Sequence, residues 1–276
     1  MFLIKTSKDS PPVVLQQGRV PSWSSDGRHI AFRRTAATNN GELGIYNVDN
    51  AKVSFPVMNI EGTKDDLAFS PDGEIIAYVN TVDSEEDLWI YDTATGDKLQ
   101  LTFDGVPKWM VTWSSDGENI AYIQDRDIWH VPSFGGQSVR LTTHPRWDAF
   151  PFWSVVETDK IYYWSLRTGW ELWSTTLEGV EKFVVNPTKE AWFPFHMSTK
   201  NEIYFVNGTG SRGDLAKVAI ETGEEHNLTS TGEANFPVAT RDGLKIAYQK
   251  ADWEGWERGV LQVQDVAHLT KPQALP

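Results

Sequence analysis

The chain repeats one pattern six times, and this internal repeat limits the folds open to it more than any other feature. Each copy has an apolar segment, a short polar turn, and a second segment in which Ile precedes Ala or Tyr and then an aromatic residue. The copies are Ile30-Ala31-Phe32, Ile76-Ala77-Tyr78, Ile120-Ala121-Tyr122, Ile161-Tyr162-Tyr163, Ile203-Tyr204-Phe205 and Ile246-Ala247-Tyr248. Successive Ile residues are 41 to 46 positions apart, a period typical of repeat architectures.

The turns between the two segments predict β-hairpins. Four copies place Ser or Thr, any residue, Asp and then Gly at this point, ending at Gly27, Gly73, Gly117 and Gly243. Asp and Ser side chains bond to turn backbone, and Gly accepts the positive φ of a tight hairpin. The fourth copy, residues 154–160, lacks the Gly, and the fifth has Lys200-Asn201 instead. We expect these two hairpins to be looser or bulged.

Two more strands follow each hairpin. The third strand is clearest at residues 87–91, 127–131 and 171–175, where apolar and polar residues alternate with the period of a half-buried strand. The fourth often ends in Leu-Thr, as at residues 101–102 and 141–142. No stretch longer than about ten residues shows helical periodicity. The sequence therefore predicts an all-β fold, a six-bladed β-propeller of four-stranded antiparallel blades.

The propeller must close, because an open last blade exposes a sheet edge. Residues 2–5 and 13–15 resemble outer strands without inner strands before them, so we expect an N-terminal strand to close the ring and the C-terminal tail to be peripheral. Residues 259–263 and 266–269 are also strand-like, which leaves open which terminal strand is spare. We expect one domain, residues 1–276. Its approximate blades are 17–62, 63–106, 107–146, 147–189, 190–232, and 233–276 with 1–16.

Charge and absent residue types exclude several classes of function. The chain has 25 Lys+Arg and 38 Asp+Glu, a formal net charge of −13, which disfavours nucleic acid and anionic membrane surfaces. It has no Cys, which excludes disulfides and thiolate chemistry. No signal peptide or apolar run of about 18 residues occurs, so no membrane insertion is expected. The expected location is cytoplasmic, or periplasmic if the sequence was trimmed from an exported precursor.

Several copies resemble the WD40-like repeats of the TolB family, P-x-W-S-P-D-G-x-x-I-A-[FY] followed by [DE]-[IL]-W. Residues 21–27 and 68–73 match the first part well. Residues 165–173, Ser-Leu-Arg-Thr-Gly-Trp-Glu-Leu-Trp, are similar to the family's S-x-R-x-G link between the second and third strands. The resemblance covers nearly the whole chain and implies a TolB-like propeller. It leaves function open, since related propellers dock proteins, cleave plant-wall sugars or gate peptidases.

Thirteen Trp residues divide into two groups by their place in the repeat. Six fall at repeated strand positions, where packing between blades accounts for them: Trp23, Trp89, Trp113, Trp129, Trp153 and Trp173. Seven lie in or beside the links around one mouth of the expected channel: Trp109, Trp147, Trp164, Trp170, Trp192, Trp253 and Trp256. If these seven are exposed, they would form an apolar patch of the kind that marks interaction sites.

Polar side chains in the same links complete a candidate ligand-binding set. Its members are Trp109, Trp147, Asp148, Arg167, Trp170, Glu190, Trp192, Asn235, Trp253 and Trp256. Flat aromatic faces between carboxylates and guanidinium groups suit a sugar ring. They equally suit a peptide anchored through Trp and Arg.

Catalysis and cofactors have less support in the sequence. There is no G-x-S-x-G elbow, phosphate loop or dinucleotide fingerprint. Asp148, Glu190 and Asp252 are the carboxylates to consider for glycoside cleavage, whose mechanism depends on a separation that a sequence does not contain. His144 and His196 lie in segments near the channel, but no pair of His has the close spacing of metal ligands. We expect no catalytic residue, metal or other cofactor.

Two hypotheses remain. The first is a non-catalytic, TolB-like binding module, a monomer that docks a protein segment or peptide at the Trp-rich mouth. The alternative is a propeller that binds an oligosaccharide, or cleaves it as a lyase or glycosidase.

Overall fold

The computed structural model describes most of the chain. The described residues are 2–3, 13–14, 19–24, 26, 28–35, 41–47, 49–50, 52–60, 66–186, 191–197, 201–208, 213–230, 232, 234–239, 245–250 and 260–265. In residues 2–3, 13–14, 19–21, 34–35, 58–60, 191–197, 234–239, 245–250 and 260–265, the description is limited to the backbone. All regular elements in these ranges are strands. None of the described segments is a helix of the length and apolarity that a membrane crossing requires.

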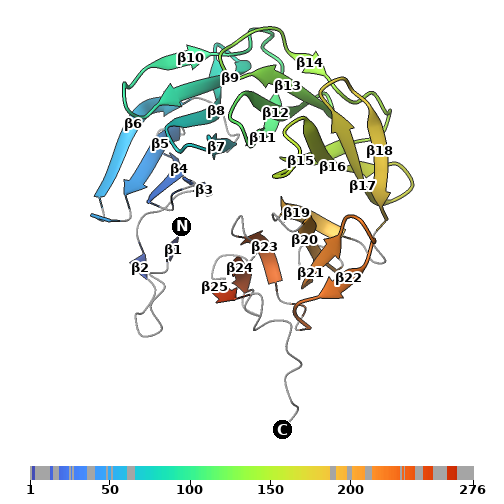
Figure 1. Cartoon of the computed structure of the whole chain (residues 1–276). Helices are drawn as coiled ribbons and strands as arrows, with labels where there is room; N and C mark the ends of the chain where they lie inside the picture. The colour runs from blue at the N-terminus through green and yellow to red at the C-terminus, as the bar shows by residue number, and fades with distance from the viewer. Residues whose placement is uncertain are drawn as a thin grey trace.

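Six antiparallel sheets, which we call blades 1 to 6, follow one another along the chain around a common axis (Figure 1). Blade 1 contains β3 (Arg19–Trp23), β4 (His29–Thr35), β5 (Gly41–Asn47) and β6 (Lys52–Ile60). Blade 2 contains β7 (Leu67–Phe69), β8 (Ile75–Val82), β9 (Glu85–Asp92) and β10 (Lys98–Gln100). Blade 3 contains β11 (Lys108–Trp113), β12 (Asn119–Gln124), β13 (Asp127–Pro132) and β14 (Val139–Arg140).

The remaining blades repeat this order. Blade 4 contains β15 (Asp148–Trp153), β16 (Lys160–Leu166), β17 (Trp170–Thr176) and β18 (Glu181–Val185). Blade 5 contains β19 (Ala191–Met197), β20 (Glu202–Asn207), β21 (Asp214–Ala219) and β22 (Glu225–Asn227). Blade 6 contains β23 (Ala234–Ala239), β24 (Lys245–Lys250) and β25 (Val260–Asp265). In every blade the first strand lies nearest the axis (Figure 1), which confirms the predicted propeller of antiparallel blades.

The Ser-x-Asp-Gly signals close the first hairpins as their chemistry predicts. In blade 2 the Ser70 hydroxyl donates to Asp72 Oδ1 at 2.5 Å and accepts from the Ile75 amide at 2.9 Å. Blades 1 and 3 repeat this arrangement around Ser24 and Ser114. In blade 4, Ser154 accepts from the Val156 and Glu157 amides instead. The hairpin without the Gly is thus built differently.

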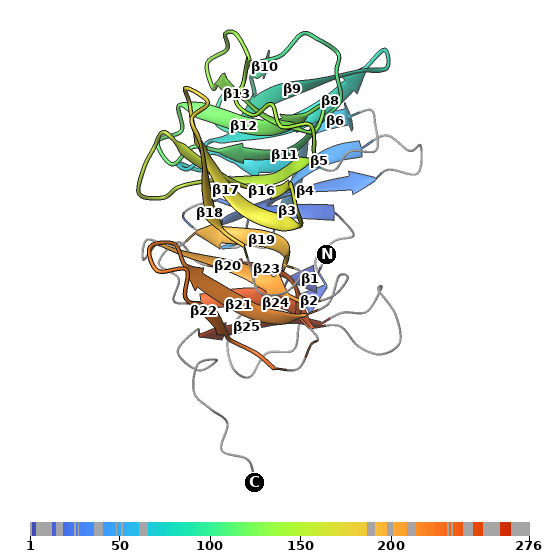
Figure 2. The ribbon, with the colours of Figure 1, turned by 90° about the vertical axis from the view of Figure 1, so that its right-hand side faces the viewer.

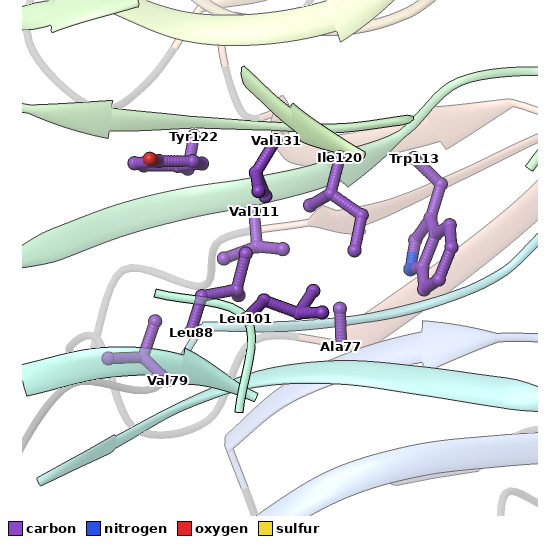
Figure 3. Close-up of a cluster of buried hydrophobic side chains, with 9 residues drawn as sticks. All are labelled: Ala77, Val79, Leu88, Leu101, Val111, Trp113, Ile120, Tyr122 and Val131. Carbon is purple, nitrogen blue, oxygen red and sulfur yellow. The ribbon is translucent and has the colours of Figure 1, made fainter. Parts of the chain in front are cut away.

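The core lies between neighbouring blades. Figure 3 shows the cluster between blades 2 and 3, where Leu88, Ile120 and Tyr122 are fully buried. Indole N–H groups join the inner strands across these boundaries. Trp113 Nε1 donates to the Ala68 carbonyl of blade 2 at 3.0 Å, and Trp153 Nε1 donates to the Thr112 carbonyl of blade 3 at 3.1 Å.

Trp23 holds the same repeat position in blade 1 but has a different environment. Its side chain is 47% exposed, against 7% for Trp113 and 5% for Trp153. Its indole N–H has no hydrogen bond to any described residue. The junction in front of blade 1 therefore lacks, in the described part of the chain, the indole bond found at the two other boundaries.

An N-terminal hairpin lies at this junction. β1 (Phe2–Leu3) pairs with β2 (Val13–Val14), and the hairpin lies between blades 1 and 6 in Figures 1 and 2. This pairing differs in detail from the expected one, in which an N-terminal strand pairs with the last blade. A contact between strands ten positions apart closes a short loop, which costs less entropy than pairing across the whole chain. Among the described strands, blade 6 has three.

Candidate ligand-binding cleft

One end of the propeller gathers the turns between second and third strands with the links that lead into the next blade. In blade 3, Asp125 and Arg126 form the turn between β12 and β13. The link from β14 to β15 passes beside this turn, because the Asp148 amide donates to the Arg126 carbonyl at 2.9 Å. Further along, the Leu166 amide donates to the Trp147 carbonyl at 2.9 Å. Backbone bonds thus fix turns and links into one surface.

A cleft of about 430 Å³ opens in this surface near the boundary of blades 3 and 4. Its lining comes from β11, the β12–β13 turn, the first residue of β13, the outer strand β14 and the link that follows it. The lining residues are Trp109, Asp125, Arg126, Asp127, Arg140, Thr143, His144, Pro145 and Arg146. The volume falls within the range of about 300 to 1,000 Å³ that is usual for small-ligand sites.

Two of the charged lining residues, Asp127 and Arg140, form an ion pair. Asp127 is buried, and its Oδ2 accepts from Arg140 Nη2 at 2.6 Å. Arg140 Nε also donates to the Thr142 carbonyl at 3.0 Å. Burial raises the pKa of Asp127, and the Arg140 guanidinium opposes this effect. This pair belongs to the wall of the cleft.

The other cationic groups of the cleft are not engaged in this way. Arg126 and Arg146 are exposed, and neither guanidinium has a partner among the described residues. His144 is half-buried, and its Nδ1 lies 3.2 Å from the Arg146 amide, which donates to it. That bond assigns the ring proton to Nε2, so Nε2 is a donor. The lining therefore carries three Arg against two Asp, a small local excess of positive charge and of donors in a chain of net charge −13.

Aromatic side chains lie beside these donors. Trp109 lines the cleft and packs against the core between blades 3 and 4. Next to it, Met110 has a φ of 55°, and Phe150 at the corresponding bulge of β15 has a φ of 53°. Left-handed φ values in such residues cost about 1 to 3 kcal/mol each and concentrate at functional sites. Phe150 also meets Trp170 edge-on, with ring centroids 6.4 Å apart.

Behind the link, Asp148 forms a buried polar site in blade 4. Its side chain has no solvent exposure, and Oδ1 accepts from the Ser165 hydroxyl at 2.5 Å. Oδ2 has no hydrogen-bond partner in the described structure. Burial raises the pKa of Asp148 to about 6, although the hydroxyls of Ser165 and Thr142 and the charge of Arg167 favour the charged form.

Arg167 is held inside the same blade. Its guanidinium forms an ion pair with Glu181, donates to Ser165 Oγ at 3.1 Å, and stacks over the Trp173 ring at 3.5 Å from the centroid. The Tyr163 hydroxyl donates to the same Glu181 at 2.8 Å. These contacts keep Arg167 in the framework of blade 4.

A repeated clamp accounts for the acidic residues that begin the third strands. In blade 2, Thr102 Oγ1 donates to Asp87 at 2.8 Å and accepts from the Leu88 amide at 2.9 Å. Blades 3 and 5 repeat the pair with Thr142 and Asp127, and with Thr229 and Asp214. The spacing from Asp to Thr is 15 residues in all three. The Leu-Thr signal is therefore structural.

The predicted site residues occupy three kinds of position. Trp109 lines the cleft, Trp147 is 46% exposed directly after Arg146, and Trp170 is half-buried behind it. Asp148 and Arg167 belong to the polar interior of blade 4. The backbones of Trp192 and Asn235 lie in β19 and β23, whose side chains are not described, and Glu190, Trp253 and Trp256 lie outside the described residues.

Two other sequence interpretations concern this region. Trp164, assigned to the rim, is 1% exposed and packs between blades 4 and 5, where it meets Phe205. His144 lines the cleft, whereas the backbone of His196 lies in β19. No group of three His, Asp or Glu side chains within the described residues is arranged to hold a metal ion.

Arg126 and Arg140 were missed at the sequence level. The signal for Arg126 was present, because Asp125-Arg126 separates two alternating segments and must therefore be the turn at the mouth. Both turn residues have positive φ, 52° and 73°, as a two-residue hairpin requires. Nothing in the local sequence indicates that Arg140 on β14 reaches the same cleft.

Comparisons of sequence find two relatives of this chain but no family model. No family model matches the chain. It is 27% identical over 195 residues to the uncharacterized peptidase YuxL of Bacillus subtilis, a match that covers 66% of this chain and 29% of that protein. It is 26% identical over 198 residues to the uncharacterized protein Atu1656 of Agrobacterium fabrum, covering 68% and 64%. The chain thus spans less than two thirds of either relative.

Solved structures show the same architecture. TolB from Acinetobacter baumannii has a TM-score of 0.64 at 16% identity, over 84% of this chain and 59% of that one. An oligogalacturonate lyase in complex with manganese has a TM-score of 0.70 at 15% identity, over 90% and 74%. The chain has a TolB-like β-propeller fold.

Proposed function

We propose that this propeller is a non-catalytic binding module that docks a protein segment or peptide at the cleft near the boundary of blades 3 and 4. The observation that carries the proposal is the combination of Trp109 with Arg126 and Arg146, whose guanidinium groups have no partner among the described residues. Trp and Arg are enriched among the residues that dominate binding energy in protein interfaces. Both types meet here in one concave site.

The carboxylates around the cleft support binding over catalysis. A general acid or base must come within hydrogen-bond reach of its substrate. Asp148 is fully buried, and Asp127 is occupied by Arg140 and by the clamp with Thr142. Asp125 is the exposed carboxylate of the lining, and no second accessible carboxylate described in the lining accompanies it, as glycoside cleavage by a carboxylate pair would require. The match to a protein named a peptidase is in keeping with a peptide ligand, and it involves only 29% of that protein.

A variant with a filled cleft tests whether the peptide binds there. Peptides selected on the immobilised wild-type protein from a random phage library serve as probes. Thr143→Trp places a large side chain at an exposed lining position without changing the charge. We expect it to weaken peptide binding at least about tenfold, as measured by fluorescence anisotropy.

Gln137→Trp is the matched control. Gln137 is exposed in the β13–β14 turn, at the other end of the same blade, so the same substitution there should leave affinity unchanged. The proposal fails if the library yields no specific peptide. It also fails if the selected peptides bind both variants as they bind wild type.

An oligosaccharide is the second candidate, because unpartnered cations suit a sugar acid and the fold matches an oligogalacturonate lyase. Trp fluorescence is titrated with oligogalacturonate and with neutral glycans, with and without manganese, followed by a reducing-sugar assay. Quenching with turnover would support an enzyme, and quenching alone would support a sugar-binding role. No response to any glycan would favour peptide docking.

A further inference from the structure

We infer that the cleft selects its peptide through a carboxylate, which is held between Arg126 and Arg146 with His144 Nε2 as an additional donor. This inference rests on the proposed function and adds the chemical class of the group that is recognised. A planar guanidinium matches a carboxylate with two parallel hydrogen bonds, and charge-assisted bonds are about twice as strong as neutral ones.

The other cations described near this end of blades 2 to 4 are already used. Lys108 is fully buried, with Nζ at 2.5 Å from Asp104 Oδ1 and at 2.8 Å from the Val106 carbonyl. Arg167 is paired with Glu181, and Arg140 with Asp127. Arg126 and Arg146 differ from these three, because neither forms an ion pair with a described acidic side chain, and the exposed Asp125 is the other charged group of the turn.

The backbone presents these two side chains on fixed segments. Arg126 sits in a two-residue turn at a φ of 73°, and its carbonyl is bonded to the Asp148 amide at the end of the link. Arg146 follows Pro145, and its amide is bonded to His144. Turn and link are thus ordered before a ligand arrives, which lowers the entropy lost on binding.

The net charge of the protein limits how many negative charges the peptide can carry. The protein carries −13, so a polyanionic peptide is repelled over distances within the Debye length of about 8 Å at physiological salt. A peptide with one carboxylate is attracted by Arg126 and Arg146 and is repelled only weakly by the net negative charge of the protein. We therefore expect the ligand to carry a single carboxylate, either an acidic side chain or a free C-terminus.

The test uses four synthetic versions of one selected peptide. The C-terminus is free or amidated, and the acidic side chains are kept or replaced by their amide counterparts. Binding to wild type should weaken about ten- to a hundredfold when the recognised carboxylate is removed. The two changes made separately distinguish a side-chain carboxylate from a C-terminal one.

The same four peptides are measured on the Arg126→Gln/Arg146→Gln double variant. In this variant, removal of the recognised carboxylate should weaken binding by less than about threefold, because the two guanidinium groups that bind it are absent. We call this loss of affinity the carboxylate effect. Arg28→Gln is the matched control, since Arg28 is exposed in the β3–β4 turn at the other end of blade 1. Each single variant is included in case the double variant does not fold.

The inference is overturned if all four peptides bind wild type equally, or if the carboxylate effect persists in the double variant. In either case Thr143→Trp can still block the peptides, so the proposed docking site would survive without its charge selection. Failure of the docking proposal itself is seen separately, when Thr143→Trp has no effect.

Discussion

Replacing Asp148 by Asn should remove a pH-dependent loss of folding stability. Burial raises the pKa of Asp148 to about 6, from 3.8 for an exposed carboxyl. The folded state therefore holds this proton more tightly than the unfolded state does. The stabilising effect is complete below about pH 4 and is lost as the pH rises through about 6. The difference of 6 − 3.8, about 2 pKa units, corresponds to about 3 kcal/mol.

Urea unfolding followed by Trp fluorescence measures this effect. Asn keeps an oxygen that can accept from Ser165 but carries no charge. From about pH 4.5 to about pH 8, the free energy of unfolding of Asp148→Asn should therefore rise by about 2 kcal/mol relative to wild type. Asp125→Asn, at an exposed turn position that tolerates Asn, is the control. If the difference between Asp148→Asn and wild type stays constant within about 0.5 kcal/mol across this range, the assignment of the buried carboxyl is refuted.

Two further substitutions test the framework of the blades. Thr142→Val leaves the buried Ile128 amide without its acceptor, and we expect a loss of about 1 to 3 kcal/mol in unfolding free energy. The exposed neighbour Thr143→Val should change it by less than about 0.5 kcal/mol; equal effects would contradict the clamp. Trp153→Phe removes an indole bond between blades and should cost about 1 to 2 kcal/mol. Trp23→Phe, at an exposed indole, should cost clearly less in the same unfolding experiment, and a larger loss there would contradict the contrast drawn between them.

The fold could be predicted from the sequence because the pattern of one blade occurs six times along the chain. A single copy such as Ile120-Ala121-Tyr122 does not distinguish a strand from a short buried helix segment. Its recurrence at an even spacing predicts the order of the strands. The Ser-x-Asp-Gly turns added local chemistry that the structure reproduces around Ser70. Closure was harder to predict, because several terminal segments can compete for one sheet edge.

The candidate site could be predicted only in part. Trp109 could be predicted, because its position beside the link, near the start of the inner strand β11, is visible in the repeat. The charge of Arg167 indicates a ligand-binding role, yet its partner Glu181 lies 14 residues away on the outer strand, a pairing that depends on the register of three strands. Trp164 was placed at the rim, although its alternation with Tyr162 along β16 directs both side chains into the core between blades 4 and 5.

The exposure of Trp23 indicates where the ring of blades would open first. Where an indole bond joins two inner strands, separating the blades breaks that bond and exposes a buried ring. In front of blade 1 Trp23 is already 47% exposed, so separating the inner strands there costs less free energy. We expect amide hydrogen exchange to be faster along β3 than along β11 or β15, and equal rates would contradict this view. Partial opening would then start on the far side of the axis from the cleft, leaving the ligand site assembled.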